Sequence, residues 1–179
     1  MKKFLLFTLI AFLVNIGTTK ANFENGITIA KVETQKDSVR LVELDKYWTE
    51  LSRTVREGDF EGYKSTYHED GVVIFAIGEN KTSMSISSAL GGWKKGFEDT
   101  KSGKVNSNVE FRFSQRIGDE TTAHETGIFH YTSADSSGKS LANQFVHFEM
   151  LMVKINGEWK GVMEYQKSIA TQEEWIILK

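Results

Sequence analysis

The chain contains no cysteine and no proline, and each absence removes classes of structure and chemistry. Without cysteine there is no disulfide framework, no cysteine-based zinc or iron–sulfur site, no thiol nucleophile and no lipidated N-terminal cysteine. Without proline, no turn is built on a cis X-Pro bond. Proteins contain about 5% proline on average, so its complete absence is a marked departure from ordinary composition.

Neither sign of charge dominates, because 22 basic and 24 acidic residues give a formal net charge of −2. Proteins that bind nucleic acid or anionic lipid carry an excess of basic residues, so we expect no nucleic-acid partner. The hydrophobic fraction of 40% is too high for a disordered chain. A length of 179 residues favours one domain over two.

The N-terminal segment has the order of regions found in secretory signal peptides. Lys2 and Lys3 form a basic start, residues 4–16 form an apolar run, and small residues follow up to Ala21. The run is shorter than the roughly 20 residues that a membrane span needs. We predict a signal peptide over residues 1–21, cleaved after Ala21, and a periplasmic or extracellular protein without membrane association. An uncleaved N-terminal anchor is the alternative.

Helical patterns dominate the next part of the chain. Residues 22–40 are polar and mixed, which is typical of a flexible lead or a loose edge strand. Apolar residues then recur at helical spacing over 41–57, and Asp59 is placed to cap a short second helix. A β-branched run over 72–77 predicts a strand, and Ser83 is the expected N-cap of a third helix.

The second half of the chain changes to the two-residue period of strands. Four strands are predicted, over residues 109–117, 121–132, 141–154 and 159–167. Asn156-Gly157 between the last two is a strong hairpin signal. In the C-terminal tail, residues 169–179, Thr171 and Glu174 have the spacing of a capping box. Helices followed by a meander of long strands indicate an α+β fold.

The element order and several short motifs resemble the nuclear transport factor 2-like superfamily, which includes ketosteroid isomerase and SnoaL-like polyketide cyclases. The matching motifs, spread over residues 41–168, are Gly58-Asp59-Phe60, Tyr67-His68-Glu69-Asp70-Gly71-Val72-Val73, Gly118-Asp119 with Ala123 and Gly127, and Asn156-Gly157-Glu158-Trp159 with Ser168. The resemblance implies a cone, in which a curved antiparallel sheet wraps around three N-terminal helices and encloses one ligand-sized pocket. It implies no particular reaction, because the fold hosts isomerases, lyases, hydrolases and binding modules.

The resemblance also suggests two catalytic candidates, His147 and Glu149, because the aligned positions usually line the cavity in relatives. Residues i and i+2 on one strand face lie about 6–7 Å apart, close enough to share a proton. A carboxyl group in an apolar cone has a raised pKa, which suits acid–base catalysis near neutral pH. Glu149 would act as the base and His147 would tune it. The alternative is a polar pair with a structural role or one that faces solvent.

Six further residues are predicted to contact a ligand. If Trp159 packs inward as in relatives, residues of the same parity on its strand share its face. Tyrosine hydroxyls could donate hydrogen bonds to a developing oxyanion, and tryptophans would form apolar walls. The predicted ligand-binding residues are Trp48, Tyr67, Trp93, Tyr131, Met163 and Tyr165.

No cofactor or metal is expected. His147 and Glu149 could supply two metal ligands, but no third histidine or carboxylate has suitable spacing. The sequence has no glycine-rich phosphate loop after a strand and no Gly-x-Ser-x-Gly elbow. Taken with the resemblance, this implies that any catalysis would be that of a cofactor-independent isomerase, lyase or hydrolase.

Two functional hypotheses follow from these observations. The first is an exported SnoaL-like domain that binds a small, partly apolar molecule, with or without acid–base catalysis. The second is a non-catalytic binding module or a homodimeric assembly module that uses the outer face of the sheet. His124, Thr126, Ile128 and Phe148 are the candidates for that outer surface.

Overall fold

The computed structural model describes residues 23–178, with side chains described from residue 36 onward, so the predicted signal peptide lies outside the described residues. The elements follow the order α1 (Phe23–Glu57), α2 (Phe60–Ser65), β1 (Tyr67–Phe75), β2 (Thr82–Ser85), α3 (Ile86–Lys101), β3 (Val105–Gly118), β4 (Thr122–Asp135), β5 (Ser140–Ile155), β6 (Glu158–Ile169) and α4 (Gln172–Ile177). This order is the α+β arrangement that the sequence predicts.

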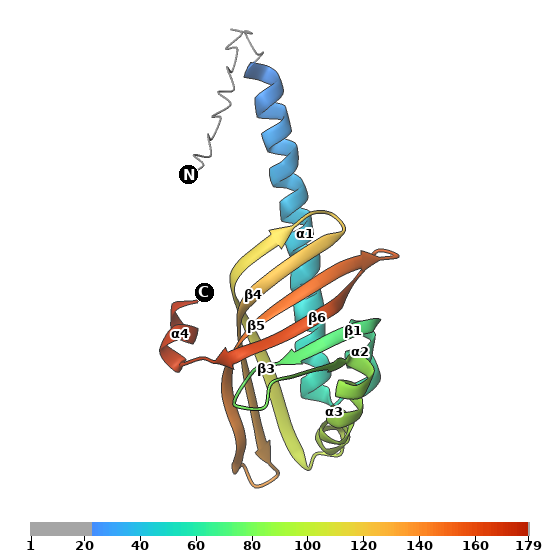
Figure 1. Ribbon diagram of the computed structural model, residues 1–179, viewed down its shortest axis with the longest axis vertical. Helices are drawn as coiled ribbons and strands as arrows, with labels where there is room; N and C mark the ends of the chain where they lie inside the picture. The colour runs from blue at the N-terminus through green and yellow to red at the C-terminus, as the bar shows by residue number, and fades with distance from the viewer. Residues whose placement is uncertain (1–22, 179) are drawn as a thin grey trace, which may run out of the picture.

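Helix α1 is one continuous helix of 35 residues, which corresponds to a length of about 52 Å. Figure 1 shows it running beside the sheet and projecting beyond it at its N-terminal end. Leu44, Trp48 and Leu51 lie on its buried face. A flexible lead or loose edge strand over residues 22–40 was the wrong expectation, because the chain is helical from Phe23 onward and pairs there with no strand. No described helix is both long and apolar enough to cross a membrane.

The six strands form one curved, open sheet in the order β2-β1-β6-β5-β4-β3. Strands β1 and β6 are parallel, and every other neighbouring pair is antiparallel. Two strands, not the single predicted one, separate α2 from α3. Because residues 82–85 pair with β1, the helix begins two residues later than expected, with Ser85 as its N-cap. The concave face of the sheet closes over the helices and forms the predicted cone (Figure 1).

A glycine and a bulge bend the sheet between β3 and β4. A Cβ atom on Gly127 would lie 2.0 Å from the carbonyl oxygen of Arg112, so only glycine fits this close approach of two backbones. The register of the two strands shifts by one residue between Phe113 and Gln115. A bulge increases the local bend of a strand. Both features therefore help the sheet to curve around the helices.

Both predicted signals at the C-terminal end are confirmed. Asn156 and Gly157 have φ values of 52° and 84°, as a tight hairpin turn between two strands requires. Thr171 and Glu174 form a capping box at the start of α4. Trp175 of this helix is buried against the outer face of the sheet, where its cluster includes Ile128. The C-terminal tail is thus packed on the convex side of the cone.

Candidate functional site

A cavity of about 440 Å³ lies between the helices and the concave face of the sheet. This volume falls within the usual range for small-molecule sites, about 300–1,000 Å³. Its walls come from all three N-terminal helices and from strands β1 and β3–β6. The lining residues are Trp48, Leu51, Val55, Tyr63, Tyr67, Phe75, Gly92, Trp93, Gly96, Phe97, Thr100, Ser107, Val109, Phe111, Phe129, Tyr131, Gln144, Phe148, Met150, Glu164 and Gln166.

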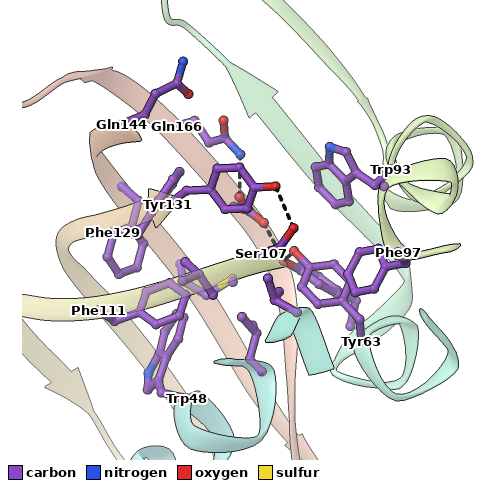
Figure 2. Close-up of a pocket in the computed structure, with 18 of the residues that line it drawn as sticks. Trp48, Tyr63, Trp93, Phe97, Ser107, Phe111, Phe129, Tyr131, Gln144 and Gln166 are labelled. Carbon is purple, nitrogen blue, oxygen red and sulfur yellow. Dashed lines mark hydrogen bonds between the residues drawn. The ribbon is translucent and has the colours of Figure 1, made fainter. Parts of the chain in front are cut away.

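Packed aromatic rings form most of the cavity wall (Figure 2). The Trp48 ring lies 4.5 Å from the Phe111 ring and 5.5 Å from the Phe148 ring, measured between centroids. On the opposite side, the Tyr63 ring lies 5.9 Å from that of Trp93. Aromatic side chains bury large apolar areas and have few rotamers, so this wall is rigid and favours an apolar ligand.

A buried carboxylate behind the wall holds Trp48 in place. The indole N–H of Trp48 donates a hydrogen bond to Glu125 at 2.5 Å, and Glu125 is fully buried. Arg116 donates two hydrogen bonds to the same carboxylate, at 2.7 and 3.1 Å, and also pairs with Asp45 at 2.6 Å. The charge of Glu125 is therefore compensated, and the orientation of Trp48 in the wall is fixed.

Glu164 is a second buried carboxyl group, and it lines the cavity itself. The Tyr67 hydroxyl donates to one of its oxygens at 2.5 Å, and the Gln166 amide donates to the other at 2.7 Å. Tyr67 and Tyr63 are joined through their hydroxyls at 3.1 Å. We call Tyr63, Tyr67, Glu164 and Gln166 the inner cluster. Each side chain in it has a hydrogen-bond partner within the cluster.

Burial raises the pKa of Glu164, although the hydrogen bonds from Tyr67 and Gln166 act in the opposite direction. Burial, followed by the nearby Glu164 charge, also raises the pKa values of Tyr67 and Tyr63 well above the ordinary phenol value. Both phenols therefore stay protonated and act as donors. Among the described side chains, no lysine, arginine or histidine lines the cavity. A carboxyl group in such a site keeps its proton to a higher pH than an exposed carboxyl group does, which suits it to donate or accept a proton.

A β-bulge turns Glu164 toward the cavity. Leu151 pairs with Met163 while Met152 pairs with Gly161, so β6 carries one extra residue between its two partners. One extra residue reverses the faces of every residue that follows it in a strand. Glu164 therefore shares the concave face with Gly161, and Met163 lies on the convex face.

Four of the six predicted ligand-binding residues line the cavity: Trp48, Tyr67, Trp93 and Tyr131. Met163 and Tyr165 do not line it, so their placement there was wrong. Trp159 does pack inward as expected, since it is only 6% exposed. The parity argument fails beyond Gly161 because of the bulge in β6.

The prediction that His147 and Glu149 point into the cavity is also wrong. Glu149 pairs with Lys167 at 2.7 Å and with His124 at 3.1 Å, and His147 lies 3.4 Å from Glu174 of α4. The hydrogen bond from Lys167 is the largest of the effects that lower the pKa of Glu149. Both residues lie on the convex face, so they do not meet a ligand held in the cone.

The alternation of apolar residues along β5 identifies the concave face of this strand. The residues that alternate with His147 and Glu149 are all apolar and almost fully buried: Val146, Phe148, Met150 and Met152. An apolar alternation of this kind marks the core-facing side of a strand. Glu164 had no comparable signal, because a bulge in β6 determines which way it points.

The described residues contain no group of three or more histidine and carboxylate side chains that could hold a metal ion. His124 and His130 lie on the convex side, where His130 stacks on Phe145 with ring centroids 4.0 Å apart. Polar groups at the cavity come instead from phenol, hydroxyl, amide and one carboxyl group.

Comparison with known proteins identifies the family to which the sequence is matched and the fold. Residues 45–172 match the SnoaL-like domain. No curated protein matches the chain. A nuclear transport factor 2-like protein of unknown function from Shewanella oneidensis MR-1 has a similar structure, with a TM-score of 0.55 and 15% identity over 72% of this chain and 98% of that one.

Two further solved structures show the same fold. A conserved protein from Planctomyces limnophilus DSM 3776 has a TM-score of 0.57 and 15% identity over 74% of this chain and 98% of that one. A ketosteroid isomerase-like protein from Erwinia carotovora atroseptica SCRI1043 has a TM-score of 0.54 and 14% identity over 73% of this chain and 96% of that one. At these identities the similarity establishes the fold.

Proposed function

Because this chain belongs to the SnoaL-like domain family, we propose that its cone binds a small, uncharged and mainly apolar molecule and transfers a proton to or from it without a cofactor. The solved relative described as ketosteroid isomerase-like is consistent with isomerase-type chemistry on this fold. The fold alone does not define a reaction, so the proposal depends on the site.

The observation that carries the proposal is the environment of Glu164. The residue is 7% exposed and lines an aromatic cavity, and burial raises the pKa of its carboxyl group. General acid–base catalysis is most effective when the pKa of the catalytic group is near the working pH. A structural carboxylate such as Glu125 is instead compensated by an arginine.

The inner cluster supports a simple sequence of proton movements. Glu164, when ionised, accepts a proton from an acidic position of the ligand and can return it to another position. The hydroxyl of Tyr67 and the amide of Gln166 hold the carboxyl group in place and stabilise its ionised form. Because the surrounding wall is apolar, these hydrogen bonds to Glu164 are stronger than they would be in water.

The first experiment is to identify the ligand. Native mass spectrometry of the protein purified from its own host would detect a co-purifying molecule, which we expect to be uncharged. Incubation of that molecule with the protein in D₂O then measures proton exchange. A cavity that retains only charged molecules would contradict the proposal.

The carboxyl variants separate catalysis from binding. We expect Glu164→Gln to lower the exchange rate by about 10²–10⁴-fold, the usual contribution of a general acid or base, while binding persists. Glu149→Gln is the matched control, since Glu149 faces away from the cavity, and it should leave the rate unchanged. An unchanged rate in Glu164→Gln would exclude Glu164 as the acid–base group and favour a binding module without catalysis.

A convex apolar band supports a second proposal, that the sheet forms a homodimer. The band crosses five strands in register, through Val72, Met163, Leu151, His124 and Ile117. Val72 and Ile117, at the two ends of the band, are 38% and 49% exposed. Leu151, at its centre, is 41% exposed. Exposed apolar patches of this kind are typical of interaction sites.

This band differs from the surface expected from the sequence. Ile128 is covered by α4, and Phe148 lines the cavity, so neither is available on the convex face. Light scattering at micromolar concentration tests the dimer. Leu151→Lys should give a monomer, and Ile177→Lys on α4, a position 76% exposed outside the band, is the matched control. A monomeric native protein would contradict this proposal.

We also propose export, on the basis of the signal-peptide pattern of residues 1–21. Cell fractionation combined with mass spectrometry of the N-terminus tests it. The expected result is protein outside the cytoplasm that begins at Asn22, and a cytoplasmic protein that begins at Met1 would contradict it.

A further inference from the structure

A second group of polar side chains lines the cavity, away from Glu164. It consists of Thr100 of α3, Ser107 of β3, Tyr131 of β4 and Gln144 of β5. The hydroxyls of Thr100 and Ser107 are 2.9 Å apart, and the Tyr131 hydroxyl donates to Ser107 over a longer distance of 3.4 Å. Figure 2 shows Tyr131 reaching toward Ser107. We call these four residues the mouth cluster.

The position of the mouth cluster in the sheet separates it from Glu164. Glu164 pairs with Met150 of β5, whereas Tyr131 pairs with Gln144 of the same strand. Six residues of an extended strand span at most about 20 Å. Glu164 is buried and Gln144 is exposed. Ser107 is buried like Glu164, whereas Tyr131 is half-buried, so Tyr131 and Gln144 are the members of the mouth cluster that lie nearer the opening than Glu164.

Two side chains of the mouth cluster, Gln144 and Tyr131, have hydrogen-bonding groups that the other described side chains use little or not at all. Within the described part of the chain, the side-chain amide of Gln144 makes no hydrogen bond, although it lines the cavity. Among the described residues, the Tyr131 hydroxyl has only its long contact with Ser107. An amide and a hydroxyl offer both donors and acceptors, and neither carries a charge. These groups are free to bind a polar group of a ligand.

Two glycines keep the cavity open beside this cluster. Gly92 and Gly96 lie inside α3 and line the cavity, and a Cβ atom on either would meet no other atom within 4 Å. Glycine inside a helix is about 1 kcal/mol less favourable than alanine. Neither the backbone conformation nor a close contact requires glycine at these positions. Their effect is to leave room at the opening.

We propose that the mouth cluster is a second anchoring site, so that the ligand is a two-ended molecule with an apolar body and an uncharged hydrogen-bonding group at each end. One end meets the inner cluster and the other meets Tyr131 and Gln144. This inference rests on the proposed function, in which the cavity binds a small uncharged molecule. The aromatic wall between the two clusters holds the apolar body.

Isothermal titration with two simple probes tests the proposal. The probes are 4-hydroxybiphenyl, which has one hydroxyl, and 4,4′-dihydroxybiphenyl, which has one at each end. We expect the wild-type protein to bind the dihydroxy probe about three- to tenfold more tightly, the value of one additional hydrogen bond. Tyr131→Phe and Gln144→Leu should reduce this preference and leave the affinity for the monohydroxy probe nearly unchanged.

A glutamine outside the cavity provides the matched control. Gln115 is exposed and does not line the cavity, so Gln115→Leu should keep the wild-type preference. Equal affinities for the two probes in the wild type, or a preference that survives in both mouth variants, would overturn the two-ended ligand. The proposed function would then still stand, because both probes bind. If neither probe binds, the proposed function fails and this inference fails with it.

The glycines allow an independent test of where the ligand enters. Gly92→Leu should weaken the binding of both probes at least tenfold, because its side chain would fill the opening. Gly91→Leu is the matched control, since Gly91 is adjacent on α3 but does not line the cavity. Circular dichroism of both variants verifies that α3 still folds. Unchanged binding in a folded Gly92→Leu variant would overturn the assignment of the opening to this face of α3.

Discussion

Glu149 and Glu164 lie on neighbouring strands of one sheet, yet they have opposite environments. Glu149, on the convex face, pairs with Lys167 at 2.7 Å and with His124 at 3.1 Å, and its pKa is lowered. Glu164, on the concave face, accepts hydrogen bonds from a phenol and an amide, and burial raises its pKa. The two faces of the sheet therefore shift the pKa values of these two carboxyl groups in opposite directions.

Glu125 shows that burial on the concave face is not sufficient by itself. Glu125 and Glu164 both pair with Met150, from opposite sides of β5, and both are buried. Arg116 holds Glu125 in an ion pair, while the inner cluster around Glu164 contains no cation. The role proposed for Glu164 therefore depends on two features together, its burial and the lack of a cation in the inner cluster.

The largest loss of stability is expected when Glu125, the carboxylate that Arg116 compensates, is removed. Glu125→Ala would leave the guanidinium of Arg116 without its buried partner and the Trp48 N–H without an acceptor. Loss of one partner of a buried ion pair typically lowers the free energy of unfolding by about 3–5 kcal/mol, and we expect the lower end of this range because Arg116 keeps its pair with Asp45. Urea unfolding measures it. Glu149→Ala on the convex face should cost less than about 1 kcal/mol, and equal losses would refute the distinction between the two faces.

A smaller loss of stability is expected when the hydrogen bond from the Tyr67 hydroxyl to Glu164 is removed. Tyr67→Phe removes the hydrogen bond that lowers the pKa of Glu164, so this pKa should rise further. The free energy of unfolding should fall by about 1–3 kcal/mol because a buried hydrogen bond is lost. Carbon-13 NMR of the Glu164 carboxyl group during a pH titration measures the shift. Tyr165→Phe, on the convex face, is the control, and a similar shift in both variants would contradict this account.

The dependence of stability on pH should also have opposite signs for the two glutamates. The folded protein holds the Glu164 proton more tightly than the unfolded chain does, so stability falls as pH rises from the ordinary value of 4.5 through the raised pKa. Each unit of difference corresponds to about 1.4 kcal/mol. Glu164→Gln should remove this fall, which thermal unfolding across the pH range would detect.

Glu149 provides the reverse case in the same measurement. Its folded pKa lies below 4.5, so its contribution is present above that pH and is lost as pH falls through the lowered pKa. Glu149→Gln should therefore flatten the acidic side of the stability curve and leave the other side unchanged. A flattening on the same side in both variants would show that the two carboxyl groups share one environment.

Local signals in the sequence predicted most elements of the fold. The apolar spacing over residues 41–57, the cap at Asp59 and the Asn156-Gly157 turn each depend on residues close together in the chain. The N-terminal extension of α1 was missed because its mixed composition has no strong period. Strand β2 was missed because its four residues are defined only by pairing with β1.

The site was less predictable for a different physical reason. Alternation along a strand predicts which face a side chain occupies only while the pairing with the neighbouring strand is regular. The bulge after Gly161 reverses the faces of the residues that follow, so Glu164 lies on the face opposite to the one that alternation predicts. The positions of His147 and Glu149 were inferred from relatives, although the apolar alternation that includes Phe148 and Met150 already marked the opposite face as buried. A local apolar pattern was thus a better guide to the cavity than the aligned positions.

The smallest change in stability is expected when the ion pair between Lys167 and Glu149 on the convex face is removed. Lys167→Met removes the main cause of the lowered pKa of Glu149. Because the Lys167 side chain is 44% exposed, the pair should contribute only about 0.2–1 kcal/mol to stability, and less at high salt. Urea unfolding of the wild type and the variant at low and high salt measures this contribution. The pKa of Glu164 should stay unchanged in Lys167→Met, since the sheet and the apolar layer of β5 separate the two carboxyl groups. A shift in the Glu164 pKa would mean that the convex charges reach the cavity, and the two faces could no longer be treated as independent.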